Sequence, residues 1–256
     1  MTFPTTIPRK DAVISFLWQH LLLLASLYLM TLGVVLCIKS YLGSSVISSL
    51  PLSFSLAGMQ GIVPPLTVGG YTIVMNFVLV LLQILVLRRR FNPMQLFQLV
   101  IGFVFGWLID VNMMATAWIE CNSALSKIIT QFAGCTVMGI GIAFEVRCGS
   151  VTMPGEGFPV ALSRVTGMPF PKVKMIVDTS LVVLAVVSSY LFFGRWAWNI
   201  IGPGTLFAML FAGYAIKLVD PRLAWFDRLL MYRPGFRRYI IGLARFIYPR
   251  SRGSQS

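Results

Sequence analysis

The chain contains two copies of one sequence pattern. Residues 31–55 recur at residues 137–163, and residues 73–86 recur at residues 175–188. The aligned positions include matched small and turn-forming residues: Gly33 with Gly139, Gly43 with Gly149, Ser44 with Ser150, and Pro51 with Pro159. Each copy holds three hydrophobic segments, and an odd number of membrane spans forces the second copy to lie upside down in a bilayer. The pattern therefore predicts two inverted repeats, at residues 13–114 and 126–219.

The composition is that of an integral membrane protein. Hydrophobic residues make up 57% of the chain, charged residues 11%, and the mean hydropathy is +0.82, which leaves too little polar surface for a soluble protein of 256 residues. An all-α polytopic fold is expected, because a hydrocarbon core is crossed by about 20 apolar residues in a helix. Six transmembrane helices are predicted: 13–38, 67–87, 94–114, 126–146, 174–194 and 199–219.

The basic residues predict the orientation. With residues 1–12 in the cytoplasm, 18 of the 21 Lys and Arg residues fall in inner segments, and only Lys39, Lys127 and Arg195 fall outside. This positive-inside bias places both termini in the cytoplasm, and it explains the net charge of +13 by contact with an anionic cytoplasmic leaflet. Nucleic acid is therefore not expected as a partner. The arginine-rich residues 220–256 are expected to lie on that leaflet as an amphipathic tail.

Two segments are expected to dip into the membrane and return, each after the first span of its repeat. Residues 40–87 contain no charged side chain, although the second span uses only about 20 residues. The dips are predicted at about 42–63 and 149–167, and inversion of the repeats would bring their tips together near the midplane. The hydroxyls and exposed amides of a substrate site there would come from Gly43, Ser44, Ser45, Gly149, Ser150 and Thr152. The alternative is that these small residues serve close helix packing.

Two acidic residues of the second copy are further candidates for the site. Glu156 lies between glycines in the second dip, where a carboxylate would serve proton coupling or cation binding unless it pairs with Arg164 or Lys172 at the interface. Asp178 aligns with Asn76, and its alternative role is an ion pair with Lys174. Glu145 is expected to snorkel at a helix end. We leave out Asp110 and Asp220, which are expected to follow their spans.

The sequence lacks the motifs of several common enzyme and cofactor-binding classes. The sequence has no GxxxxGK loop, no HExxH helix and no GxSxG elbow, so no enzyme activity and no cofactor are predicted. His20 is the only histidine, and the four cysteines have no CxxC spacing, which indicates reduced thiols and no metal site.

The segments GSS (residues 43–45), GEGFPVALSRVTGMPFPKVKMIVD (155–178) and IGPGTLFAMLFAGYAIKL (201–218) resemble the YczE/YitT group of bacterial integral membrane proteins. The resemblance covers about residues 15–220 and implies a multi-pass protein of the bacterial inner membrane, and it identifies no catalytic residue. We expect a secondary transporter or channel-like carrier of a small solute or ion, which could assemble as a homo-oligomer. The alternative is a membrane scaffold that docks a cytoplasmic biosynthetic partner through its basic inner face and tail.

Overall fold

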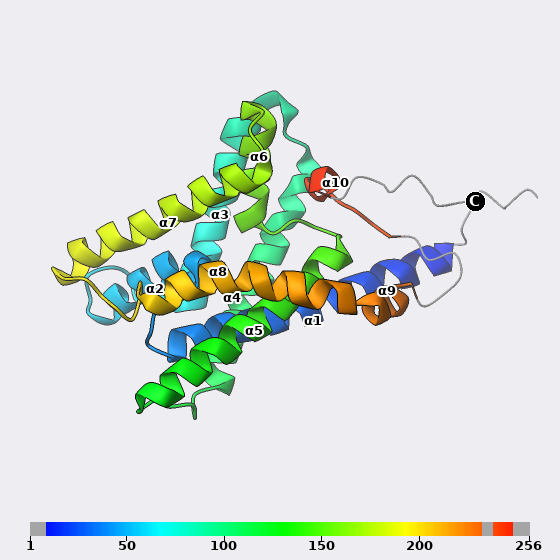
Figure 1. The fold of residues 1–256 in the computed structure, drawn as a ribbon. Coiled ribbons are helices and arrows are strands. Elements are labelled where there is room, and N and C mark those ends of the chain that lie inside the picture. The colour runs from blue at the N-terminus through cyan, green and yellow to red at the C-terminus, as the bar shows by residue number, and fades with distance from the viewer. Residues whose placement is uncertain (1–8, 232–237, 248–256) are drawn as a thin grey trace, which may run out of the picture.

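All regular structure in the described part of the chain is helical. The computed structural model describes residues 9–231 and 238–247, and Figure 1 shows their arrangement. The helices are, in chain order, α1 (Arg9–Lys39), α2 (Val46–Met59), α3 (Val68–Leu87), the 3-10 turns η1 (Arg88–Arg90) and η2 (Pro93–Leu96), α4 (Phe97–Ala115), α5 (Ala124–Cys148), α6 (Pro154–Thr166), α7 (Phe170–Phe193), α8 (Pro203–Val219), the 3-10 turn η3 (Asp220–Arg222), α9 (Ala224–Leu230) and α10 (Ala244–Ile247).

Five helices are long and apolar enough to cross a membrane. They are α1, α3, α4, α5 and α7, and they coincide with five of the six segments expected to span. The sixth expected span corresponds to α8, which is apolar but has only 17 residues, somewhat fewer than the roughly 20 that a spanning helix needs. The chain is therefore a multi-pass membrane protein by the length and composition of its helices.

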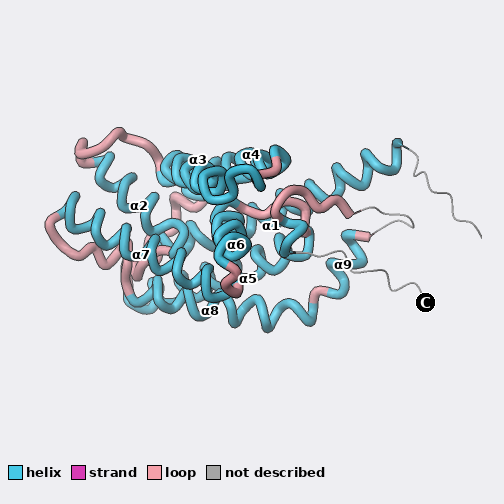
Figure 2. The backbone as a smooth tube through the Cα atoms, turned by 90° about the horizontal axis from the view of Figure 1, so that it is seen from above, coloured by secondary structure: helices cyan, strands magenta, loops and turns pink. Residues whose placement is uncertain are grey.

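The two expected dips correspond to the short helices α2 and α6. They contain 14 and 13 residues, which at about 1.5 Å per residue is too short to cross a hydrocarbon core. Each carries a proline at its sixth position, Pro51 in α2 and Pro159 in α6, and both prolines are buried. Figure 2 shows α6 near the middle of the molecule with α3 and α7 beside it.

Helices α1 and α5 cross in antiparallel directions at positions with small side chains. A Cβ at Gly33 would lie 2.4 Å from the backbone nitrogen of Met138, and a Cβ at Gly134 would lie 2.9 Å from the backbone nitrogen of Cys37. Residue numbers therefore rise along one helix as they fall along the other. Such close approach needs glycine, as in other membrane helix pairs, and it brings the Sγ atoms of Cys37 and Cys135 to 3.8 Å.

The contacts between helices largely follow the repeat, in which α1, α2, α3 and α4 correspond to α5, α6, α7 and α8. When each helix of a contacting pair is replaced by its counterpart, the new pair is usually also in contact. Helix α2 packs on α7 and α6 packs on α3, while α1 packs on α4 and α5 packs on α8. The pair α3 and α4 breaks the pattern, because α7 and α8 scarcely touch and diverge in Figure 1. Each short helix thus packs against the second long helix of the other copy, in addition to its own.

Asp110 differs from its expected place. It lies inside α4, where its carboxylate accepts hydrogen bonds from the Gly69 amide at 2.9 Å and from the Thr67 hydroxyl at 2.7 Å. It therefore caps the N-terminus of α3, where a negative charge is favourable, and our placement of it after the span was wrong. The side chain of Asp220 lies outside the described residues.

The described part of the C-terminal segment packs on the protein. In α9, Phe226 stacks on Phe144 of α5 with ring centroids 4.4 Å apart, and Asp227 forms an ion pair with Arg147. Further along, the Tyr239 amide donates to Gln19 Oε1 at 2.8 Å. Leaflet binding by the rest of residues 220–256 stays a prediction, because residues 232–237 and 248–256 lie outside the described part.

Candidate functional site

The first glycine-serine segment forms a junction with the chain that leads into α8. The Ser44 amide and hydroxyl both donate to the Ile200 carbonyl at 3.0 Å. Gly43 has a φ of +118°, and a Cβ there would lie 2.5 Å from the Thr205 hydroxyl. The Ser45 hydroxyl is within 2.7 Å of that of Ser48. These hydroxyls already have protein partners, which favours the packing role that we considered for this segment.

The second glycine-serine segment contacts different parts of the chain. Gly149 ends α5 in the left-handed conformation, with a φ of +56°. The Ser150 hydroxyl shares a hydrogen bond of 3.0 Å with His20 Nε2, and its carbonyl accepts from the Ile241 amide at 2.7 Å. Thr152 is 2% exposed, and its hydroxyl has no hydrogen-bond partner among the described residues. Ser44 and Ser150 therefore have separate partners and do not form one site.

The short helices approach each other at apolar residues. A Cβ at Gly155, in the first turn of α6, would lie 2.3 Å from Ile47 Cδ1 in the first turn of α2. These two positions are equivalent when Pro51 is aligned with Pro159. The surrounding cluster is hydrophobic and includes Met75, Leu79, Leu181, Leu50 and Phe158. The point at which α2 and α6 meet is thus filled by apolar side chains.

A group of buried polar side chains surrounds the first turns of α6. Gln83 of α3 and Gln98 of α4 are 0% and 1% exposed, and both face Gly157: a Cβ there would lie 3.1 Å from Gln83 Oε1 and 2.5 Å from Gln98 Oε1. Asn76 of α3 is 2% exposed and donates to the Gly102 carbonyl at 3.2 Å. We call these three amides, together with the half-buried Glu156 that directly precedes Gly157 in α6, the polar cluster.

The amides of the polar cluster have unmet hydrogen-bonding capacity. Within the described chain, neither the nitrogen nor the oxygen of Gln83 and Gln98 has a partner, and Asn76 Oδ1 has none. A buried polar group without a partner costs about 1–3 kcal/mol, and most such groups in proteins are satisfied by protein or water. The arrangement therefore provides donors and acceptors that a bound solute, ion or water could use.

Charged groups of two other helices, α5 and α7, lie near Glu156. Glu156 is close enough to Lys174 and Asp178 of α7 to interact with them electrostatically, and Glu145 of α5 interacts with Glu156 in the same way. Lys174 donates to Asp178 at 2.7 Å, which confirms the intrahelical ion pair considered for Asp178. Glu145 is only 3% exposed, so our expectation of a snorkelling residue at a helix end was wrong.

The structure brings together some of the predicted site residues and adds others. Asn76, Glu156 and Asp178 lie in or beside the polar cluster, Thr152 lies two residues before α6, and the two glycine-serine segments are elsewhere. Sequence reasoning missed Gln83 and Gln98. Gln83 is the only polar side chain between residues 77 and 87, and a polar residue within a span is itself a signal of function.

The chemistry available in the polar cluster is that of oxygen ligands and amide donors. The carboxylate of Glu156 and the amide oxygens of Gln83, Gln98 and Asn76 suit a small hard cation or a proton, whereas the amide nitrogens suit a polar solute. Within residues 9–231 and 238–247, no three His, Cys, Asp or Glu side chains are grouped to hold a metal ion.

The comparisons with known proteins establish the family. No curated protein and no solved structure shows significant similarity to this chain. A family model matches residues 17–221, which include the polar cluster and every helix from α2 to α8. The chain belongs to the family described as "Family of unknown function (DUF6198)".

Proposed function

We propose that the protein is a secondary transporter or channel-like carrier of a small solute or ion, in which the polar cluster binds the transported or coupling ion. The observation that carries this proposal is the pair of buried amides, Gln83 and Gln98, which face Gly157 of α6 and have no hydrogen-bond partner among the described residues. In a membrane protein such groups are costly, and they commonly mark ion or substrate pathways.

The proposed architecture is two inverted repeats with α2 and α6 as re-entrant helices. The antiparallel crossing of α1 and α5 and the exchanged packing of α2 and α6 support it. Carriers built in this way place their sites where broken helices begin inside the membrane. We place the protein in the bacterial inner membrane with both termini cytoplasmic, in line with its basic inner loops and its resemblance to the YczE/YitT group.

Ion movement in proteoliposomes tests the proposal. Uptake of ²²Na⁺ and the response of a trapped pH dye would be measured under an imposed membrane potential. Replacing both amides, Gln83→Leu with Gln98→Leu, is expected to lower the flux of the conducted ion about tenfold or more, because each charge-assisted contact that is lost contributes about 1.5–3 kcal/mol. Absence of both sodium and proton flux in the wild-type protein would overturn the ion-site proposal.

A matched control lies at the other short helix. Ser53 of α2 and Ser188 of α7 share a buried hydrogen bond of 2.9 Å. The double change Ser53→Ala with Ser188→Ala removes this interhelical bond without touching the polar cluster, so flux is expected to stay within about twofold of wild type. An equal loss of flux in both double variants would indicate that the effect is on the fold.

The alternative function, a scaffold for a cytoplasmic partner, is tested on the exposed arginines of the C-terminal segment. Deleting residues 221–256 would also remove packed residues such as Phe226, so substitution is sharper. The variant Arg222→Gln with Arg228→Gln and Arg245→Gln removes three exposed positive charges. Ion flux is expected to persist in this variant, whereas a protein whose only role is docking would show no flux in any form.

A further inference from the structure

Two adjoining cavities open at the ends of α1 and α2 and at the loop between α7 and α8. Their volumes are about 660 Å³ and 680 Å³, within the usual range for small-molecule sites of roughly 300–1,000 Å³. Four residues line both: Tyr41, Leu56, Met59 and Asn199. The surrounding loops are those that the positive-inside bias places outside. We call the two spaces together the outer cavities.

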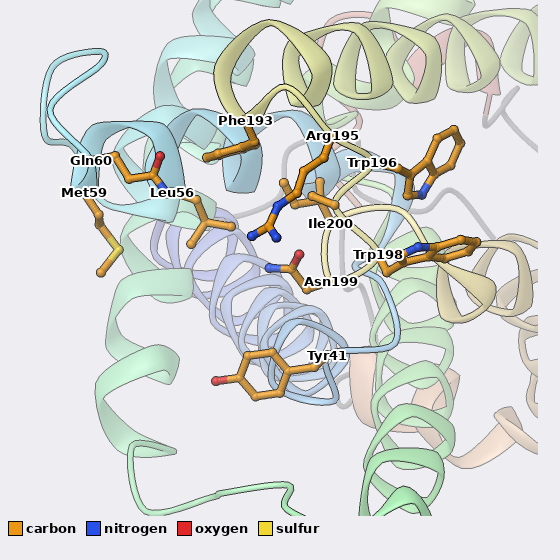
Figure 3. A pocket seen from close by; sticks show the side chains of 11 residues that line it. Tyr41, Leu56, Met59, Gln60, Phe193, Arg195, Trp196, Trp198, Asn199 and Ile200 are labelled. Atoms are coloured by element: carbon orange, nitrogen blue, oxygen red, sulfur yellow. The ribbon is translucent and has the colours of Figure 1, made fainter.

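The first cavity carries the positive charge of Arg195, which no described residue neutralises. Arg195 and Asn199 project into the same space, with Leu56 and Tyr41 around it (Figure 3). Among the described residues, no hydrogen bond or ion pair engages the Arg195 guanidinium. A guanidinium beside an amide presents several donors with fixed geometry, which suits a carboxylate or phosphate.

The other charged groups of the outer cavities are already engaged. Lys39 lines the second cavity and donates to the Thr116 carbonyl at 2.5 Å, and Asp110 caps α3. Lys39 and Arg195 are two of the three basic residues predicted on the outer side, where basic residues are otherwise sparse. Their place at these cavities, with Arg195 available, favours a negatively charged ligand.

Tyr41 provides an independent sign of a ligand site. Its φ is +58°, a left-handed conformation that bulky residues rarely adopt. Strained residues of this kind gather at ligand-binding positions, where the surrounding structure holds them. Tyr41 lines both cavities and is 58% exposed, so its ring is available to a molecule that occupies either.

The second cavity is mainly apolar. Its lining includes the hydrophobic side chains of Leu52, Leu66, Val68, Met113 and Met114. We propose that the outer cavities bind an amphipathic acid, with its anionic headgroup on Arg195 and Asn199 and its apolar part in the second cavity. This chemistry is shared by a free fatty acid and an anionic phospholipid. The binding is an equilibrium property of this face and does not require that the protein transports anything.

Quenching of tryptophan fluorescence tests the proposal, because Trp196 and Trp198 line the first cavity. The purified protein would be titrated in micelles with 9,10-dibromostearic acid and with its methyl ester, and in nanodiscs with dibrominated phosphatidylglycerol. Saturable quenching by the acid, or by phosphatidylglycerol if the lipid is the natural source, is expected. The uncharged ester should bind about tenfold or more weakly, because it lacks the charge-assisted contact.

The matched variants are Arg195→Gln and Lys127→Gln, which each remove one outer charge. Arg195→Gln is expected to weaken the saturable quenching about tenfold or more, while Lys127→Gln, which lies away from the cavities, should leave it within twofold. Arg195 is exposed and Lys127 is half-buried, and neither belongs to the buried core, so neither change removes core packing. The proposal is wrong if the acid binds no better than the ester and phosphatidylglycerol gives no Arg195-dependent signal. It is also wrong if Arg195→Gln binds both the acid and phosphatidylglycerol as wild type does. An Arg195-dependent signal from phosphatidylglycerol alone supports it and identifies the ligand as lipid.

Discussion

The two short helices are similar in sequence and packing, but they have opposite surroundings. Around α6, Gln83 and Gln98 lie buried with no hydrogen-bond partner in the part of the chain that the structure describes. Gln83 aligns with Ala185, and Gln98 aligns with Ala208 when residues 92–97 (NPMQLF) are matched to residues 202–207 (GPGTLF). These two alanines are 0% and 2% exposed. Buried amides without a partner among the described residues therefore occur at only one of these two related interfaces.

The hydroxyl groups of α2 differ from the amides around α6, because each has a hydrogen-bond partner in the protein. Ser49 donates to the Val46 carbonyl at 2.8 Å, Ser53 shares a hydrogen bond with Ser188, and Ser55 donates to the Leu66 carbonyl at 3.1 Å. Such satisfied groups stabilise a helix interface and leave little capacity for a ligand. The hydroxyls of α2 thus serve the fold, whereas the amides around α6 keep the unmet polar capacity on which the proposed function rests.

The largest expected effect on stability comes from placing a glutamine at the α2 interface, at the position equivalent to Gln83. Ala185→Gln would place an amide without a partner in a closely packed position. Burial of the unpaired group and overpacking together are expected to destabilise the protein by about 2–4 kcal/mol. The midpoint of thermal unfolding should fall by about 5–10 °C.

The midpoint is measured with a thiol-reactive fluorogenic dye, because the four cysteines, Cys37, Cys121, Cys135 and Cys148, are free and buried and become reactive on unfolding. Ala185→Ser serves as the control for polarity with little added volume. A midpoint for Ala185→Gln equal to that of wild type would show that the α2 interface tolerates an amide, and the contrast between the two interfaces would fail.

The reverse change is expected to stabilise the protein. Gln83→Leu replaces an unpartnered amide by an apolar side chain of similar volume, so the desolvation penalty of about 1–3 kcal/mol is relieved. We expect the thermal midpoint to rise by a few degrees while ion flux falls, a trade of function for stability that is common at functional sites. A lower midpoint would mean that Gln83 holds the fold together.

The smallest effect is expected at Asp178. Its ion pair with Lys174 is a partly exposed pair one turn apart on a helix, which contributes only about 0.3–0.5 kcal/mol. Asp178→Asn restores the residue type found at Asn76, and the thermal midpoint should shift by no more than about 1–2 °C. A larger shift would show that the carboxylate takes part in the polar cluster through Glu156.

Much of the fold could be predicted from the sequence, because apolar length and the repeat are local signals. They located five long helices and the short helices α2 and α6. Aligning Pro51 with Pro159 also makes Ile47 and Gly155 equivalent, and these two residues lie against each other in the structure. The partners of the glycine-serine segments could not be predicted. Ile200 lies 156 residues from Ser44 along the chain, and no sequence signal connects the two.

The candidate site was predicted only in part, because we considered charged residues in apolar stretches and overlooked the uncharged glutamines. Glu156 was found as an acidic residue in an apolar stretch, whereas Gln83 and Gln98 carry no charge and have no polar counterpart in the second copy. Glu145 was assigned to a helix end, since α5 ends three residues later, and the packing that buries it is not visible in the sequence. A search for polar residues that differ between the copies would have found both glutamines.

The most direct test of the central claim is the accessibility of equivalent cysteines at the two interfaces. Gln98→Cys and Ala208→Cys would be treated in sealed, oriented membranes with a small membrane-impermeant thiol reagent added from each side, with the parent protein as background. If the polar cluster is reached by water and solute, Gln98→Cys reacts from the cytoplasmic side at least about tenfold faster than Ala208→Cys. Equal reactivity at both positions, or no reaction of Gln98→Cys from either side, would contradict the assignment of function to α6.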